Sequence, residues 1–127
     1  MALLNEINYV NFAESVIEKI KDKDGNIALT TSKIRKLLSM SADIYNEVII
    51  YNDEVLSDEI IGRIEYLRMN FMYEAGRDVV VKDFVIKSKA SEILKEVSKE
   101  KSKKYYLLFN KYMEAIVAFH KFNNGRD

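Results

Sequence analysis

The chain contains no cysteine and no proline, and only four glycines and one histidine among its 127 residues. Without cysteine, disulfides and thiolate metal sites are excluded, and the composition fits a reducing compartment. Without proline, the sequence lacks the residue that most strongly interrupts a helix. Because the glycines are widely separated, at positions 25, 62, 76 and 125, a glycine-rich phosphate loop is excluded as well.

Long apolar runs are also missing. No stretch approaches the ~20 apolar residues that a membrane-spanning helix needs. The first residues, Met1–Glu6, do not show the basic-then-apolar order of a secretory signal. We therefore expect a soluble, cytoplasmic protein with no membrane partner.

Charge is balanced overall but unevenly distributed. The 20 basic and 20 acidic side chains cancel, so no whole-molecule field attracts nucleic acid or membrane. Residues 1–81 carry a net charge of −5 and residues 82–127 a net charge of +5, while residues 41–66 alone carry −6. This pattern fits one surface for an anion and another for a basic partner, or solvated helix faces of uneven sign.

Apolar residues recur at three- and four-residue steps, which predicts amphipathic helices. The short run Val79–Val81 also fits a strand, but a lone strand has no partner. We predict an all-α protein, a compact bundle of about five helices forming one domain over residues 1–127, with a frayed tail from about 123. Gly25 and Gly76 are expected to end the first and third helices. The expected helices cover 9–20, Thr30 or Thr31 to about 51, 57–76, about 80–98 and 105–122.

The inventory of reactive groups gives no catalytic site. His120 is the only histidine, and no serine has a sequence-level partner for a triad. Metal-binding spacings are absent, including the Glu-x-x-His pairs of di-iron bundles. The positions four to six residues before His120 hold no arginine, so the motif of small helical ribonucleases is missing. We therefore expect no catalytic residue, no metal and no cofactor.

Three cations stand on the first turns of the second predicted helix. Lys33, Arg35 and Lys36 have no acidic residue near them in sequence, from Asn26 to Ala42. A helix start already carries partial positive charge, so acids are normally favoured there. An anionic partner or plain solvent exposure could explain these cations, and the local sequence does not decide between them.

Further cations are candidates for the same kind of contact. Arg68 and Arg77 lie on or just past the third predicted helix, followed by Lys82 and, at the end of the last helix, Lys121. The helix dipole explains a cation at the position of Arg77 equally well.

Most of the aromatic residues fall on apolar stripes, so we interpret them as core residues rather than base-stacking platforms. Tyr73 and Tyr106 are the two aromatic residues most expected to reach solvent. His120 lies at the edge of an apolar face and is expected to pack or cap.

Several segments together carry a family resemblance. The block Leu29–Leu38 is the most specific, and the others follow it in order over nearly the whole chain. With them, the sequence resembles the small subunit of the type III-A (Csm) CRISPR effector complex. The further matching segments are Tyr66–Arg68, Tyr73–Arg77, Val81–Asp83, Tyr112–Ala115 and Phe119–Phe122.

The resemblance implies a non-catalytic, all-helical protein that stacks as several copies inside a ribonucleoprotein. Its partners would be the guide RNA, the target RNA and the other subunits of the complex, which carry the cleavage and cyclic oligoadenylate chemistry. Phosphate contacts by a rigid helical face would suffice, since base pairing reads the sequence. The residues expected to contact RNA are Lys33, Arg35, Lys36, Arg68, Arg77, Lys82 and Lys121.

Three other hypotheses remain open at this point. The chain could be a helical interaction module that dimerises through the last helix and binds no RNA. A small enzyme would need a pair of acidic residues that meet only in the folded protein. A helix-turn-helix DNA reader is disfavoured, because no glycine turn links two short helices at the expected spacing.

Overall fold

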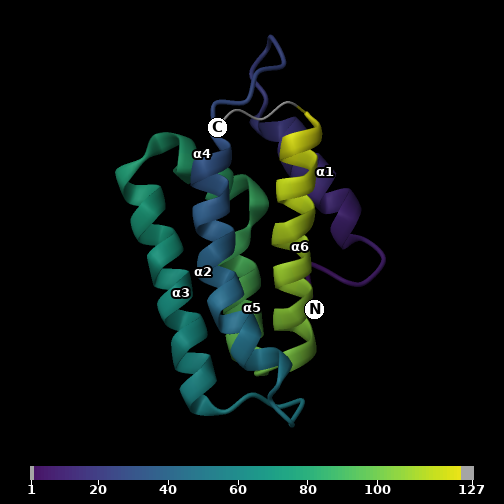
Figure 1. The fold of residues 1–127 in the computed structure, drawn as a ribbon, viewed down its shortest axis with the longest axis vertical. Coiled ribbons are helices and arrows are strands. Elements are labelled where there is room, and N and C mark those ends of the chain that lie inside the picture. The colour runs from purple at the N-terminus through teal and green to yellow at the C-terminus, as the bar shows by residue number, and fades with distance from the viewer. Residues whose placement is uncertain (1, 124–127) are drawn as a thin grey trace.

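The computed structural model describes residues 2–123, and within them the regular secondary structure is helical, apart from two isolated bridge pairs in the loops (Figure 1). The all-α prediction is confirmed, with six helices among the described residues in place of about five. The predicted fraying of the tail falls almost entirely on residues outside the described part. The helices are α1 (Tyr9–Ile20), α2 (Thr31–Ile49), α3 (Asp58–Arg77), α4 (Val79–Ser88), α5 (Ala90–Glu100) and α6 (Lys103–Phe122).

Short polar side chains fix where four helices begin. Thr30, rather than Thr31, caps α2 by accepting a hydrogen bond from the backbone N–H of Lys33 at 3.2 Å. Ser57 and Ser102 cap α3 and α6 in the same way. Asp78 caps α4, so the run from Val79 is helical and not a strand. Each cap satisfies a backbone donor that a helix start otherwise leaves unpaired.

The additional helix comes from a break at Lys89. The sequence predicted one helix from about 80 to 98, but Lys89 adopts a left-handed conformation with φ 59° and separates α4 from α5. Its N–H bonds to the carbonyl of Ile86, which closes the last turn of α4. Left-handed geometry usually signals glycine. A lysine at this position gave no sequence signal for the break.

The sequence predicted that Gly25 and Gly76 end the first and third helices, and neither residue does so. Gly76 lies inside α3, which continues to Arg77 and ends where Asp78 turns extended. Gly25 does adopt a positive φ of 81°, but it closes a turn several residues after α1 has ended at Ile20. Residues with extended backbone, Lys21 and Asp78, therefore end these two helices.

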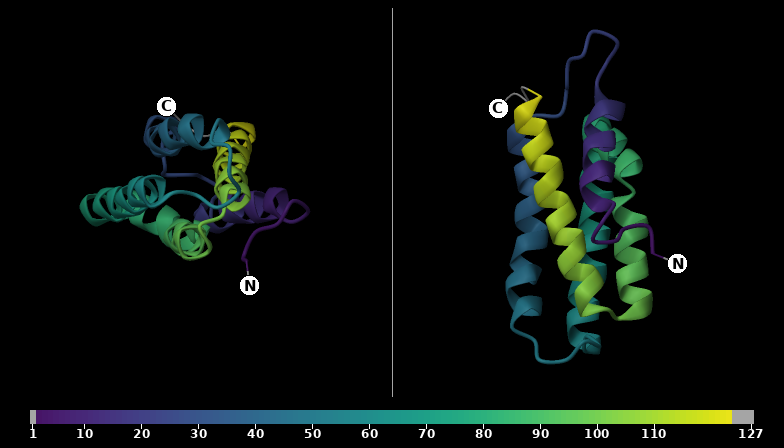
Figure 2. Two further views of the ribbon diagram at one scale, coloured as in Figure 1. Left: turned by 90° about the horizontal axis from the view of Figure 1, so that it is seen from below. Right: turned by 90° about the vertical axis from the view of Figure 1, so that its right-hand side faces the viewer.

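Helix α6 contributes more buried side chains than any other described helix. It packs against α1, α2 and α5 (Figure 2) and supplies a large share of the buried side chains. Its rings continue the core towards α3, where the centroid of Phe109 lies 6.3 Å from that of Phe71. Apart from Phe122, which is 86% exposed, the wide apolar surface of this helix is therefore largely covered within the chain.

Three polar contacts from α6 hold the neighbouring segments in register. The hydroxyl of Tyr106 donates to the carbonyl of Ser41 at 2.6 Å, and that of Tyr112 donates to Ser88 at 2.8 Å. His120 Nε2 lies 2.6 Å from the carbonyl oxygen of Leu29. Tyr106 is fully buried, so the expectation that it reaches solvent was wrong, whereas His120 packs as expected. Burial raises the pKa of Tyr106 and of Tyr112 above the usual range for tyrosine.

Helices α2 and α3 lie side by side and run in opposite directions (Figure 1). Helix α2 begins with cations and ends near Asp43 and Glu47, while α3 begins with Asp58 and Glu59 and ends at Arg77. The antiparallel arrangement thus brings cations together at one end of this pair and acids at the other. Among the described helices, none combines the length and apolar character needed to cross a bilayer.

Replacing Lys89 with glycine should stabilise the fold by about 1 kcal/mol, because glycine adopts the left-handed conformation without the steric cost that lysine bears. Lys95→Gly is the matched control. It lies exposed inside α5 and should destabilise by about 1 kcal/mol through lost helix propensity. Urea unfolding at pH 7 measures both changes. Equal signs for the two variants would contradict the assignment of strain to Lys89.

Candidate nucleic-acid interface

The ends of four helices meet at one end of the bundle. Lys33, in the first turn of α2, bonds to Asp78, which joins α3 to α4. At the end of α6, His120 contacts the carbonyl of Leu29, just before α2 begins. These two contacts bring together the starts of α2 and α4 and the ends of α3 and α6.

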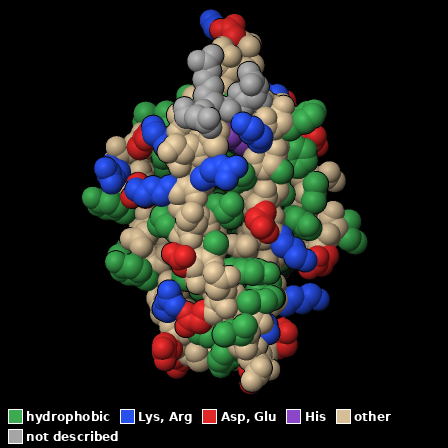
Figure 3. All heavy atoms as spheres, viewed as in Figure 1, with side chains coloured by type: hydrophobic (Ala, Val, Ile, Leu, Met, Phe, Trp, Pro, Cys, Tyr) green, Lys and Arg blue, Asp and Glu red, His purple; other side chains and the backbone are tan. Residues whose placement is uncertain are grey.

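Six of the seven cations expected to contact RNA lie at this end, which we call the basic end. Figure 3 shows Lys and Arg side chains gathered over the upper part of the face that it displays. They come from separate parts of the sequence, and the fold brings them to one region. The residues of the basic end are Lys33, Arg35 and Lys36 on α2, Arg77 on α3, Lys82 on α4 and Lys121 on α6.

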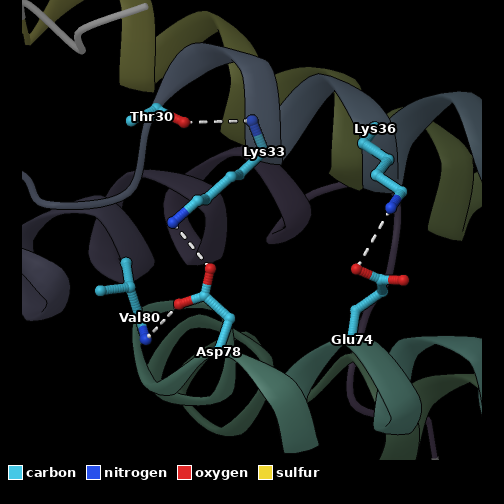
Figure 4. A network of polar contacts seen from close by, with 6 residues as sticks. All are labelled: Thr30, Lys33, Lys36, Glu74, Asp78 and Val80. Carbon is cyan, nitrogen blue, oxygen red and sulfur yellow. Dashed lines mark hydrogen bonds and ion pairs between the residues drawn. The ribbon is translucent and has the colours of Figure 1, made fainter.

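Two of these cations, both on α2, form ion pairs with acidic residues near the end of α3 (Figure 4). Lys33 Nζ lies 2.7 Å from Asp78 Oδ2, and Lys36 Nζ lies 3.3 Å from Glu74 Oε1. The hydrogen bond from Lys33, helped by the N–H of Val80, holds the pKa of Asp78 below its usual range. Tertiary contacts therefore offset the unfavourable position of these lysines at a helix start.

Arg77 is held in place by its own helix. Its guanidinium lies 5.6 Å from the centroid of the Tyr73 ring, and Nη1 lies 3.7 Å from Glu74 Oε2. Tyr73 is 63% exposed, as the sequence predicted. Arg77 also lines a shallow hollow of about 220 Å³, together with Lys33, Lys36, Leu37, Glu74, Asp78 and Val81. The hollow thus has three cations and two acids around it.

The other three cations of the basic end point into solvent. Arg35, Lys82 and Lys121 are exposed, and none forms an ion pair with another described side chain. A cation without a protein partner can bind a phosphate without first giving up a contact. These three side chains are therefore the most readily available to an anion.

Arg68 does not belong to the basic end. It makes two hydrogen bonds to Glu65, at 3.0 and 3.1 Å, and Glu65 also accepts one from Ser98 on α5. Arg68 precedes Arg77 by nine residues, about 13 Å and two and a half turns along the helix, so the two side chains point to opposite sides. The bonds from Arg68 hold the pKa of Glu65 low, and the group ties α3 to α5.

Glu74 and Asp78 are the participants that sequence reasoning missed. They lie some forty residues from the lysines that they pair with, and no local pattern links them. No group of three or more potential metal-ligating side chains comes together within residues 2–123.

Comparison with known proteins gives a family for this arrangement. Residues 7–126 match the family model described as "Csm2 Type III-A". The "CRISPR system Cms protein Csm2" of Streptococcus thermophilus is 44% identical over 128 residues, covering all of both chains. The chain belongs to the Csm2 family. Proteins of the same name from Enterococcus italicus and Mycobacterium tuberculosis are 37% and 34% identical, covering 89% and 94% of this chain and 87% and 94% of their own.

Membership of the Csm2 family confirms the resemblance to the small subunit of type III-A CRISPR complexes. The match begins at the turn before α1 and continues through all six helices. The four segments whose ends form the basic end therefore all lie inside the matched region.

Because its folded pKa is lowered, ionised Asp78 stabilises the fold above its ordinary pKa of 3.8, and that contribution is lost as the pH falls through the folded value. Asp78→Asn keeps a capping oxygen but removes the charge that faces Lys33. We expect its Tm to be lower than that of the parent protein by roughly 1–3 °C at pH 7. The gap should close below about pH 4.

Thermal unfolding followed by circular dichroism between pH 3 and pH 7 measures this difference. Asp43→Asn is the control, since Asp43 is exposed and has no ion pair with a described side chain. A gap for Asp78→Asn that stays constant over the whole range would show that the charge of Asp78 contributes nothing.

Proposed function

We propose that the chain is a non-catalytic structural subunit of a type III-A CRISPR ribonucleoprotein that binds RNA through phosphate contacts at its basic end. Family membership supports the place in the complex. The observation that carries the RNA contact is the convergence of six cations from four helices at one end of a chain with no net charge. Lys and Arg on rigid elements position a nucleic-acid backbone without reading its sequence.

The guide RNA and its bound target are the proposed ligands. In a guide complex, base pairing supplies specificity, so a subunit along the duplex needs to recognise only charge and shape. The other subunits and further copies of this chain are the proposed protein partners. The reactive-group inventory supports a role without bond breaking, and bond chemistry would then reside in those other subunits.

The paired lysines can still take part in such binding. The side chains of Lys33 and Lys36 are 43% and 57% exposed, and exposed ion pairs of this kind contribute little net energy. A phosphate can therefore replace Asp78 or Glu74 at modest cost. Arg35, Lys82 and Lys121 bind without such a cost, so we assign them the larger part of the affinity.

A module that dimerises through the last helix is the second hypothesis, and the packing of α6 within the bundle favours it less than RNA binding. The apolar residues of α6 pack on α1, α2 and α5, and its exposed positions are mostly charged, among them Lys104, Lys111, Glu114 and Lys121. Self-association would need another surface.

Replacing Arg35 and Lys82 together with alanine should weaken binding of single-stranded RNA and make it less sensitive to salt. Each lost phosphate contact should flatten the slope of log affinity against log salt concentration by roughly 0.7. Fluorescence anisotropy of a labelled RNA across a sodium chloride series measures the slope. Neither side chain has an ion pair with a described residue, so we expect Tm to be unchanged.

The control variant replaces Lys99 and Lys104, which are exposed at the opposite end of the bundle and carry the same total charge. If both variants shift the slope equally, binding follows net charge and the basic end has no special role. In the assembled complex, RNA crosslinks should fall on the basic end. Crosslinks confined to other parts of the chain would overturn the site while leaving family membership intact.

A further inference from the structure

The hollow at the basic end has carboxylates lying beneath its cations. Lys33, Lys36 and Arg77 line it with side chains that are 43%, 57% and 59% exposed. The side chains of Glu74 and Asp78, which line the same hollow, are only 19% and 27% exposed. The cations are therefore the outer groups, and the acids lie deeper.

Glu74 is shared between two of these cations. Its Oε1 lies 3.3 Å from Lys36 Nζ on α2, and its Oε2 lies 3.7 Å from Arg77 Nη1 on its own helix. One carboxylate therefore has both cations as partners, and it reduces the positive charge that each presents to solvent.

The position of Glu74 is not explained by its own helix. It lies in the last turn of α3, where the helix dipole favours cations over acids. Its contact with Arg77, three residues further on, adds little to the stability of a helix. The exposed pair with Lys36 likewise adds little to the stability of the fold. Stability alone is thus a weak reason for an acid at this position.

Asp78 holds Lys33 in a comparable way and is anchored more firmly. Its Oδ2 lies 2.7 Å from Lys33 Nζ, while its Oδ1 accepts a hydrogen bond from the backbone N–H of Val80 at 3.0 Å. Figure 4 shows Asp78 and Glu74 both pointing towards the lysines of α2. Because a backbone bond fixes Asp78, it stays beside Lys33 when another anion approaches.

The two acids change how the hollow meets a phosphate. Its three cations alone would give it a charge of +3, and its two acids reduce this charge to +1. A carboxylate and a phosphate are both anionic acceptors, and they compete for the same N–H donors. The hollow therefore binds a phosphate less tightly than its cations alone would.

We propose that Glu74 and Asp78 are built-in competitors of the RNA backbone, which suppress RNA binding by Lys33, Lys36 and Arg77 in the free chain. This inference rests on the proposed function and adds a control to the same site. RNA held by other subunits presents its phosphates at a high effective concentration, which overcomes the competition. The free chain thus binds stray RNA only through its unpaired cations, whereas the whole basic end takes part inside the complex.

Glu74→Gln tests the competition directly, because it removes the charge of Glu74 and keeps its size. We expect single-stranded RNA to bind roughly fivefold more tightly at low salt, since one competing charge close to the phosphate is lost. The slope of log affinity against log salt concentration should become steeper by roughly 0.7 for each phosphate contact that Lys36 or Arg77 gains. Fluorescence anisotropy measures both quantities. A labelled RNA with hydroxyl ends keeps terminal phosphates from contributing.

Glu59→Gln is the matched control for Glu74→Gln. Glu59 is exposed in the first turn of the same helix, at its opposite end, and has no ion pair with a described side chain. This variant changes the net charge equally and should leave the salt slope unchanged. Equal effects of the two variants would show that net charge governs binding and would overturn the proposal. A Glu74→Gln variant that binds RNA like the parent chain, or more weakly, overturns it as well.

The gain in salt slope should depend on the two cations that Glu74 releases. In a chain that already carries Lys36→Ala and Arg77→Ala, Glu74→Gln frees no cation and should leave the slope of that background unaltered. If the slope becomes steeper there by the same amount, Glu74 acts without its two partners, and the assignment of competition is wrong.

Asp78→Asn gives an independent test in which stability and affinity move in opposite directions. The variant keeps a capping oxygen and releases Lys33, so RNA should bind roughly threefold to fivefold more tightly, while the Tm at pH 7 falls. An ion pair with a structural role alone would lower the Tm and leave the affinity for RNA unchanged. That result would contradict the proposed role of Asp78.

Failure of this proposal can be told apart from failure of the proposed function. RNA binding that weakens in Arg35→Ala with Lys82→Ala, but is the same in Glu74→Gln, Asp78→Asn and the parent chain, would show that the basic end binds RNA without control by the acids. If neither the parent chain nor the two acid variants bind RNA at low salt, the proposed RNA contact itself is wrong, and the competition falls with it.

Discussion

The packing of α6 inside the bundle is the contact on which the other features depend. Because this helix touches α1, α2 and α5, its position sets the position of the others. The core provides most of the stabilisation, but apolar contacts alone leave register loosely defined. The bonds from Tyr106, Tyr112 and His120 to backbone carbonyls of other segments remove that freedom. His120 matters most for the surface, since it fixes the end of α6 beside the start of α2.

The parts of this fold that depend on local signals could be predicted from the sequence. Apolar periodicity located the helices, and the hydroxyl residues at Thr30 or Thr31 and at Ser57 marked two of their starts, because a capping hydroxyl acts on residues of its own turn. The break at Lys89 could not be predicted, because a non-glycine residue takes a left-handed conformation only when tertiary packing compensates for it. Tyr106 was misjudged for a related reason. Its buried partner is the carbonyl of Ser41, which lies 65 residues away in the chain.

In the candidate site, too, some features follow from the local sequence and others only from tertiary contacts. The types and positions of its cations can be read from the sequence, and the segments that contain them resemble the small subunit of one kind of complex. Their grouping is a tertiary property, because it depends on which helix ends meet. Arg68 looked equivalent to Arg77 in sequence, yet its contacts with Glu65 hold it on the α5 side of the same helix. Ion pairing also separates Lys33 from Arg35, two residues that the sequence presents alike.

The opposed charge gradients of α2 and α3 have a consequence for how the molecule meets a polyanion. A chain with equal numbers of positive and negative groups feels almost no net pull from a distant nucleic acid. Within about one screening length, roughly 8 Å at physiological salt, the two ends experience different potentials. The result is a torque rather than a force. A polyanion within that distance would therefore turn the molecule so that the cations at the start of α2 face it and the acids at the start of α3 point away.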